Sequence, residues 1–243
     1  MNVPSKALLS IELFRAFYEY GAGWALSIPL RLISPRGDGH PVMIIPGLGT
    51  TDVSTYFIRN FLNNLGYKAY SWGFGRNLGP RNGIPRMAAQ LSKRVKQISE
   101  ECGGQQVSLI GWSLGGIYAR EIAKIIPEHI RQVITLASPF KGHAGRTNLT
   151  PLYEFLSKDK AHKTEERMRL LAIPPPLPFT SLYSKTDGVV FWRCAIEEEG
   201  PISENIEILG ASHLGIGHNP AAMYIIAQKL IHTRETWRPY KKN

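Results

Sequence analysis

The strongest chemical signal in the chain is a serine flanked by glycines in the segment Gly111–Gly115, which reads G-W-S-L-G. It fits the pattern G-x-S-x-G, in which a serine sits on a strained turn between a strand and a helix. Glycines on either side leave room where a side chain would collide with that turn. An apolar run over 107–110 precedes the motif, and a helical pattern over 116–126 follows it. The helix N-terminus would favour developing negative charge. We therefore expect Ser113 to be a nucleophile.

From about Pro41 to the end of a helical pattern over 220–232, the chain resembles the α/β-hydrolases, in particular their bacterial lipase and carboxylesterase branch. The resemblance rests on the serine motif, a T-D-G-V-V segment at 186–190 and an S-H-x-G segment at 212–215. It does not extend to the N-terminal segment. In this family the catalytic residues follow one another in the order Ser, then Asp or Glu, then His. The resemblance thus implies an acid and a base downstream of the serine.

That order narrows the choice of the acid. Asp38 and Asp52 precede the nucleophile and are out of order. Asp159 lies in a charged helical stretch, where a solvated carboxylate is the ordinary interpretation. Asp187 follows a strand pattern and resembles the family's triad acid, although Asp followed by Gly is also a common turn. We expect Asp187 to be the acid. Glutamates 197–199 are a fallback, since three adjacent acids more often form a solvated face.

The base is sought among His213, His218 and His232, which lie downstream of this acid. His232 falls at the end of the last helical pattern, where a cation suits the helix dipole. His213 follows an apolar strand pattern and a turn, and it resembles the histidine of the family's S-H-x-G loop. His218 is left as a residue that lines the pocket. We expect His213 to take the proton from Ser113, while Asp187 fixes its tautomer and stabilises the imidazolium.

Acyl transfer also needs two donors aimed at the developing oxyanion. In the family one is the backbone N–H after the nucleophile, here Leu114, and the other comes from the loop after the first strand, here residues 46–50. Leu48 is the expected second donor, and Gly47 and Trp112 are expected to contact substrate. Many lipases carry His-Gly in this loop, whereas this chain has Pro-Gly, which removes a bracing imidazole but no backbone donor. The alternative is that the loop glycines only make a tight turn.

Apolar runs alternate with helical patterns along the chain, which is typical of βαβ units. Continuous apolar strands fit a sheet covered on both faces. We expect an α/β-hydrolase fold with a mainly parallel sheet of about six strands flanked by helices. A Gly-Arg-Asn segment at 75–77 resembles a lipase pattern and is interpreted as structural. The expected strands are 42–45, 67–72, 107–110, 133–137, 181–183 and 206–209, and the expected helices are 56–65, 84–99, 116–126 and 220–232.

The stretch from Lys141 to Pro178 has no strand pattern. Its charged helical part, 153–171, carries apolar side chains among many charges, which favours a short helical lid over one end of the sheet. Such a lid would uncover the site for an apolar acyl chain. The alternative is a packed helix pair over a small rigid pocket. We expect a single domain over 1–243, with residues 1–40 as an N-terminal helical extension and residues 141–178 as the lid or cap insertion.

The N-terminal segment, residues 5–20, places apolar side chains near one another at helical spacing. It predicts either a helix that docks on the domain or an interfacial membrane helix. Two glutamates interrupt the apolar run, so no signal peptide is clear, and the run 22–33 is too short and broken to span a bilayer. A cytoplasmic or membrane-peripheral location is favoured. The apolar side chains are Leu8, Ile11, Phe14, Phe17 and Tyr18.

Composition sets outer limits on function. With 43% hydrophobic and 20% charged residues, the 243-residue chain fits a globular protein rather than a disordered one. The net charge of +10 favours anionic partners, but the sequence has no zinc-finger spacing, RNP-like motif or long run of like charge, so no nucleic acid partner is expected. Two cysteines, Cys102 and Cys194, make no disulfide framework, and whether they pair stays open.

Taken together, these signals predict a serine hydrolase that cleaves carboxylic esters of short to medium apolar acyl groups through an acyl-enzyme, with weak activity on peptides. No organic cofactor is needed, and no His/Cys/Asp cluster has zinc spacing. The expected partner is a small-molecule ester with an apolar acyl group, and contact with a membrane or lipid surface is left open. The alternatives are an acyltransferase using the same site, a peptidase or amidase, and a non-catalytic binding protein with this fold.

Overall fold

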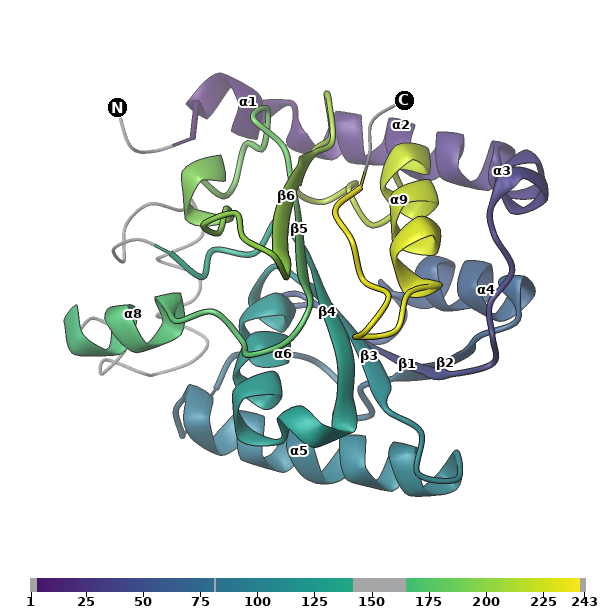
Figure 1. Ribbon diagram of the computed structural model, residues 1–243. Helices are drawn as coiled ribbons and strands as arrows, with labels where there is room; N and C mark the ends of the chain where they lie inside the picture. Colours follow the sequence, from purple (N-terminus) through teal and green to yellow (C-terminus); the bar gives the residue numbers. More distant parts are fainter. Residues whose placement is uncertain (1–3, 81, 142–164, 241–243) are drawn as a thin grey trace.

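A computed structural model describes residues 4–80, 82–141 and 165–240 of the chain, and its centre is one parallel sheet (Figure 1). The six strands lie in the order β2-β1-β3-β4-β5-β6 and all neighbouring pairs are parallel. The predicted parallel sheet is confirmed, with each strand within a few residues of its expected range. The strands are β1 (Pro41–Ile45), β2 (Lys68–Ser71), β3 (Val107–Trp112), β4 (Ile130–Leu136), β5 (Phe179–Tyr183) and β6 (Ser203–Glu207).

Helices cover both faces of the sheet, as the continuous apolar strands predict. Successive strand residues point to opposite faces, so Val42 and Ile44 of β1 join a core with α4 and α9, whereas Met43 and Ile45 join a core with α5 and α6. Figure 1 shows these two layers on either side of the strands. The covering helices are α4 (Tyr56–Leu65), α5 (Ile84–Glu101), α6 (Leu114–Ile125) and α9 (Pro220–Leu230), and two short 3₁₀ turns are Pro127–His129 and Trp192–Cys194.

The order of the strands places two loops side by side. β1 lies between β2 and β3, so the chain direction across the sheet reverses there. In open parallel sheets the crevice at the carboxyl ends of the strands next to such a reversal is the usual ligand site. The loop after β1 contains Gly47, and Ser113 follows β3 directly. The Cβ of Ser113 lies 3.4 Å from the position that a Cβ on Gly47 would take. The fold therefore brings the nucleophile candidate to the expected oxyanion loop.

Three helices precede the sheet and lie in a row along one side of the molecule (Figure 1). The segment that the sequence predicted to dock on the domain or on a membrane contacts the domain through charged side chains, and the central members of its apolar set face outward. Phe14 and Phe17 are 77% and 74% exposed, whereas Glu12 and Glu19 are buried. The physical reason is that backbone N–H groups of the loops below need acceptors, and the carboxylates supply them. The helices are α1 (Lys6–Ser10), α2 (Glu12–Ala25) and α3 (Ser27–Ile33).

The predicted lid is described only in part, because residues 142–164 lie outside the described residues. Within the remainder, α8 (Glu165–Ala172) is tied to α6 at its C-terminal end. Lys124 donates to the carbonyl of Leu170 at 2.9 Å, and Arg120 donates to the carbonyl of Ile173 at 3.1 Å. Leu171 is buried in the core on the α5–α6 side of the sheet. This end of the insertion is thus anchored, and whether the rest acts as a lid stays a prediction.

Candidate active site

Ser113 occupies the strained turn that its motif predicts. It links β3 to α6 with φ 52° and ψ −119°, a left-handed value of φ that is uncommon for residues other than glycine. A Cβ on Gly111 would collide with the backbone of Gly116, and one on Gly115 would collide with the carbonyl of Ile45. The motif glycines are therefore required by close backbone approach. Strain of this kind holds a side chain in one direction.

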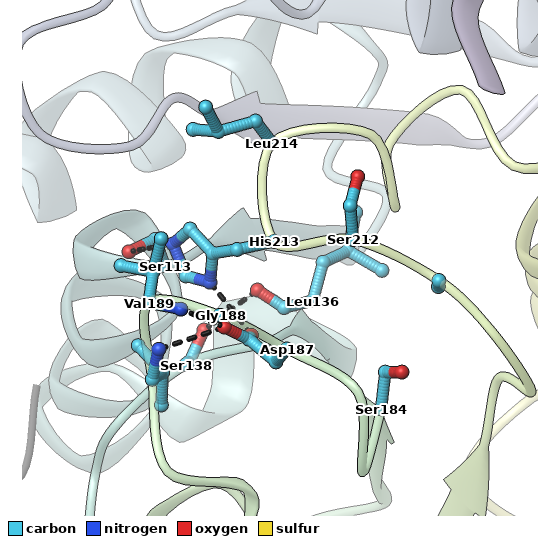
Figure 2. Close-up of polar contacts among 12 residues, drawn as sticks. Ser113, Leu136, Ser138, Ser184, Asp187, Gly188, Val189, Ser212, His213 and Leu214 are labelled. Carbon is cyan, nitrogen blue, oxygen red and sulfur yellow. Dashed lines mark hydrogen bonds and ion pairs between the residues drawn. The ribbon is translucent and has the colours of Figure 1, made fainter. Parts of the chain in front are cut away.

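The structure brings Ser113, His213 and Asp187 into one hydrogen-bonded row (Figure 2). Ser113 Oγ lies 3.0 Å from His213 Nε2, and His213 Nδ1 lies 2.8 Å from Asp187 Oδ2. The other carboxyl oxygen, Asp187 Oδ1, accepts from the backbone N–H of Val189 and Val190, both at 2.7 Å. Because a carboxylate only accepts, Nδ1–H is the donor to Asp187, which leaves Nε2 as the acceptor for the serine hydroxyl.

The electrostatic surroundings separate His213 from His218. Burial works against a charge on His213, but the charge and hydrogen bond of Asp187, together with the charge of Glu12, outweigh it and raise the pKa of His213 above its ordinary value. Burial lowers the pKa of His218 to about 4. Its ring packs 5.0 Å from Tyr20 and 5.2 Å from Phe57, centroid to centroid. His213 therefore has the hydrogen-bond partners that a general base needs, whereas His218 is partly buried and packs against aromatic rings.

Asn77, which belongs to the Gly-Arg-Asn segment, braces the loop after β1. The buried side chain of Asn77 donates to the carbonyl of Pro46 at 2.9 Å, and its backbone N–H donates to Thr50 at 2.8 Å. The carbonyl of Asn77 in turn accepts from the N–H of Gly49 at 2.7 Å. Asn77 thus holds the loop after β1 at both of its ends. Leu48, whose N–H is the expected second oxyanion donor, belongs to this braced loop.

Leu114 is the first residue of α6, so its N–H has no acceptor within its own helix. The helix begins at the nucleophile, and the partial positive charge of its N-terminus favours an anion there. Leu114 and the loop of Leu48 thus belong to two elements that meet at Ser113, and their part as oxyanion donors stays a prediction. Gly47, expected to contact substrate, lies against the serine, and a side chain there would narrow this approach.

Trp112 has contacts that differ from those of a pocket wall. Its side chain is buried in the core on the α4–α9 side of the sheet, and its indole N–H donates to the carbonyl of His213 at 3.0 Å. The ring also packs against Gly217, where a Cβ would run into it. These contacts hold the loop that carries the base. The structure thus shows Trp112 in contact with the loop of His213, and its expected contact with substrate stays a prediction.

Sequence reasoning missed the part of the N-terminal helices in the site. One oxygen of Glu12 accepts from the backbone N–H of His213 and of Leu214. The other accepts from the N–H of Gly188, next to Asp187, at 3.2 Å. One side chain of α2 thus joins the loop of the acid to the loop of the base. Burial, and then the charge of Asp187, raise the pKa of Glu12.

Two more charged residues of α2 hold the same loops. Arg15 donates to the carbonyls of Thr186, Gly210 and Ala211 at 2.7–2.8 Å. Glu19 accepts from the hydroxyl of Ser212 and, at 3.0 Å, from its backbone N–H. The sequence did contain a signal for these contacts, namely three charged residues within an otherwise apolar helix. A charge that is buried needs polar partners, so these residues could have been expected to bond to loops of the domain.

A second Ser–His–Asp row lies elsewhere in the fold. Ser108 Oγ is 2.8 Å from His40 Nε2, and His40 Nδ1 is 2.5 Å from Asp38 Oδ1. Ser108 is fully buried inside β3, so a substrate cannot reach its hydroxyl. Burial is the largest influence on His40 and lowers its pKa. This row has the hydrogen-bond distances of a catalytic triad, but substrate cannot reach its serine and no helix begins there. It is therefore a natural control that shows what hydrogen-bond distances alone do not establish for the row at Ser113.

Of the three fallback acids, Glu198 and Glu199 are exposed as expected, and Glu197 has another role. Glu197 was expected on a solvated face but is buried, and its Oε2 accepts from Arg120 at 2.8 Å. Its other oxygen pairs with Lys141 at 2.5 Å. The guanidinium of Arg120 lies 3.9 Å from the ring centre of Phe140. A buried cation explains why a carboxylate lies there, and this pairing gives Glu197 no part in orienting His213.

Comparisons with known proteins find relatives among lipases and thioesterases. The model of the palmitoyl protein thioesterase family matches residues 41–174. Over 112 residues the chain is 34% identical to a triacylglycerol lipase of Pseudarthrobacter phenanthrenivorans, which covers 42% of this chain and 34% of that protein. Over 156 residues it is 28% identical to a thioesterase of Dothideomycetidae sp. (strain 11243), which covers 61% and 51%. The chain therefore spans a third to a half of the length of these relatives.

Among solved structures, a mature lipase of Bacillus licheniformis is similar with a TM-score of 0.62 at 16% sequence identity. The similarity covers 82% of this chain and 95% of that one. At this identity the likeness is one of fold, and it confirms the expected α/β-hydrolase architecture. Within the described ranges, no helix is long and apolar enough to cross a membrane.

Proposed function

Because the chain belongs to the palmitoyl protein thioesterase family within the α/β-hydrolases, we propose that it hydrolyses esters or thioesters of apolar acyl groups through an acyl-enzyme on Ser113. The observation that carries the proposal is the row of hydrogen bonds from Ser113 to His213 at 3.0 Å and from His213 to Asp187 at 2.8 Å. A nucleophile within reach of a base, with the base oriented by a third group, is the arrangement that activates a serine.

In the first half of the reaction, Ser113 Oγ attacks the acyl carbon and its proton passes to His213 Nε2. The carbonyl oxygen becomes an anion, which the backbone N–H groups of Leu48 and Leu114 stabilise. The bond to the leaving group then breaks, and His213 returns the proton to the departing oxygen or sulfur. The products are a free alcohol or thiol and an acyl ester of Ser113.

In the second half, water attacks the acyl ester and gives its proton to His213 Nε2. Collapse of this second oxyanion releases the carboxylic acid, and the proton returns to Ser113 Oγ. Asp187 holds the imidazole in the tautomer that leaves Nε2 free, and it stabilises the imidazolium in both halves. The raised pKa of His213 fits this role, because the charged form is the one that the transition states require.

The sequence favoured carboxylic esters, and the family broadens this to thioesters. The two differ in how much they need His213 as an acid. A thiol has a pKa of about 8.5, so a thiolate leaves near neutral pH with little help. An alkoxide leaves only with a proton. The site can therefore serve both bonds, and substrate preference depends on the acyl and leaving groups.

A pair of substrates that differ in one atom tests the reaction. Octanoylcholine and octanoylthiocholine carry the same acyl chain and the same cation, and hydrolysis of either supports the proposal. A series of nitrophenyl esters from acetyl to octanoyl then measures the preference for apolar acyl groups, since each buried methylene contributes roughly 0.8 kcal/mol. Hydrolysis of none of these by a folded protein would contradict the proposal.

The same assay distinguishes a hydrolase from the two alternatives, an acyltransferase and a non-catalytic binding protein. Adding a second alcohol, such as glycerol, diverts the acyl group into a new ester if the enzyme is a transferase. The carboxylic acid then falls below the amount of choline released. A binding protein would release no choline. We expect the carboxylic acid and choline to form in equal amounts.

A further inference from the structure

The outer side of the N-terminal helices is an apolar surface. On α2, Leu13, Phe14, Phe17 and Tyr18 are 65–77% exposed. Their spacing of three and four residues makes them neighbours on one side of the helix. On α3, Ile28, Leu32 and Ile33 are also exposed. We call these seven side chains the apolar face. Large exposed apolar patches are rare on monomeric soluble proteins and mark interaction sites.

The inner side of α2 fixes the orientation of this face. All three charged residues of α2, namely Glu12, Arg15 and Glu19, bond to the loops that carry Asp187 and His213. Rolling α2 to bury its phenyl rings would take these charges away from Gly188, Ser212, His213 and Leu214. Those backbone N–H groups would then lose their acceptors. The apolar face is thus turned outward by the same contacts that hold the site.

We propose that the apolar face docks on the surface of a bilayer containing anionic lipids, with α2 and α3 lying in the plane of the membrane. The 14 residues of α2 and the 7 of α3 are too few to span a hydrocarbon core. A helix with one apolar side instead lies at the boundary between headgroups and acyl chains. In ordinary amphipathic helices the polar side faces water, whereas here it faces the enzyme.

Charge favours a lipid surface over a second copy of the chain. The protein carries a net charge of +10, so two copies repel each other, whereas a negatively charged leaflet attracts it. Exposed basic residues flank the apolar face on both sides, Lys6 on α1 and Arg36 after α3. Around its edge lie Tyr20 and Trp24, 49% and 38% exposed, and such aromatic residues are enriched at membrane interfaces.

Docking in this way would set the active site beside the membrane. The helix that meets the lipid also bonds to Gly188 and Leu214, the neighbours of Asp187 and His213. Leu214 is partly exposed, and in Figure 2 its side chain points away from the triad. The loops that carry Asp187 and His213 would then lie directly behind the docked helix. The docking itself does not depend on the chemistry of Ser113.

Vesicle sedimentation with the full chain tests the proposal without any substrate. Vesicles of phosphatidylcholine alone are compared with vesicles containing one quarter phosphatidylserine. We expect the wild type to sediment with the anionic vesicles and to bind at least tenfold more weakly in 0.5 M salt, which screens charge. The double variant Phe14→Gln/Phe17→Gln should lose binding at least tenfold at low salt, since both side chains are exposed and glutamine is a good helix former.

The matched control is Val53→Gln/Ile125→Gln, which also removes two exposed apolar side chains, but outside α1–α3. It should bind vesicles like the wild type. Circular dichroism and melting temperature check that both double variants are folded. Wild-type protein that stays in the supernatant with anionic vesicles overturns the proposal, as does equal binding by the Phe14/Phe17 variant. A third outcome also overturns the proposal: the wild type and the control form a dimer, the Phe14/Phe17 variant does not, and the wild type does not bind vesicles. The apolar face would then be the contact between two copies of the chain.

Discussion

Replacing Glu12 by glutamine should shift the pH dependence of catalysis. Removing the charge of Glu12 takes away one of the two charges that raise the pKa of His213 and leaves Asp187 in place. The pKa of His213 then falls. Since the base must be neutral to accept the serine proton, the acid limb of kcat/KM, which reports the free enzyme, moves to lower pH.

The size of the shift follows from the geometry. The Glu12 carboxylate accepts from the backbone N–H of His213, and we take a charge separation on the order of 6 Å between it and the imidazole. For an effective dielectric constant of about 20–80, Coulomb's law gives about 0.7–2.8 kcal/mol, or about 0.5–2 pH units. We expect about one unit. The amide also leaves donors without an acceptor, at about 1–3 kcal/mol each, so the melting temperature should fall.

The assay measures kcat/KM for a soluble nitrophenyl ester between pH 5 and 9, at a temperature where the variant is folded. The matched control is Glu19→Gln, because Glu19 bonds to Ser212 and Asn219 and is not among the charges that raise the pKa of His213. It should lower the melting temperature but leave the acid limb in place. An unmoved limb for Glu12→Gln, or a limb moved to higher pH, would refute the reasoning.

Three further predictions concern the site itself. His213→Ala should lower kcat by about 10⁴-fold or more, whereas His218→Ala should change it only a few-fold while lowering the melting temperature, because the ring packs against aromatic side chains; the reverse ranking in nitrophenyl ester kinetics would exchange the two roles. Asp187→Asn should cost about 10⁴-fold in kcat at neutral pH by favouring the wrong tautomer, and a mild loss would remove Asp187 as the triad acid. Asn77→Ala should lower kcat at least tenfold with a smaller change in KM, because it loosens the loop that carries an oxyanion donor; an unchanged kcat in a folded variant would show that the loop does not need this brace.

The sheet and its covering helices could be predicted from sequence because their signals are local. The range 56–65 is a helix with the expected bounds. The strand predicted at 67–72 is found as β2 at Lys68–Ser71. Strand ends shifted by a few residues, as in β4, which begins at Ile130 rather than at 133. Pairing with neighbouring strands decides those ends, and a single sequence does not contain it.

The N-terminal helices could not be oriented from their apolar pattern. The helical spacing correctly predicted that the apolar side chains share one side of α2. Which side of the helix is buried, however, depends on the contacts that each side makes with the rest of the domain. For Glu12 these are backbone N–H groups about 200 positions away in the chain. Likewise, Ser108 and Ser113 have similar hydrogen-bond distances to a histidine, and only their burial and the strand-to-helix turn separate them. The sequence motif made that choice possible because it encodes the turn and not the hydrogen bonds.

The most direct test of the account is to find which serine a fluorophosphonate modifies. Such a probe reacts with a serine activated by its base, and mass spectrometry of the digested protein locates the adduct. We expect one adduct, on the peptide that contains Ser113. Ser113→Ala should remove it, whereas Ser108→Ala should keep it, because Ser108 is buried in β3 despite its bond to His40. An adduct on Ser108, or no adduct on the folded wild-type protein, would contradict the assignment of Ser113 as the nucleophile.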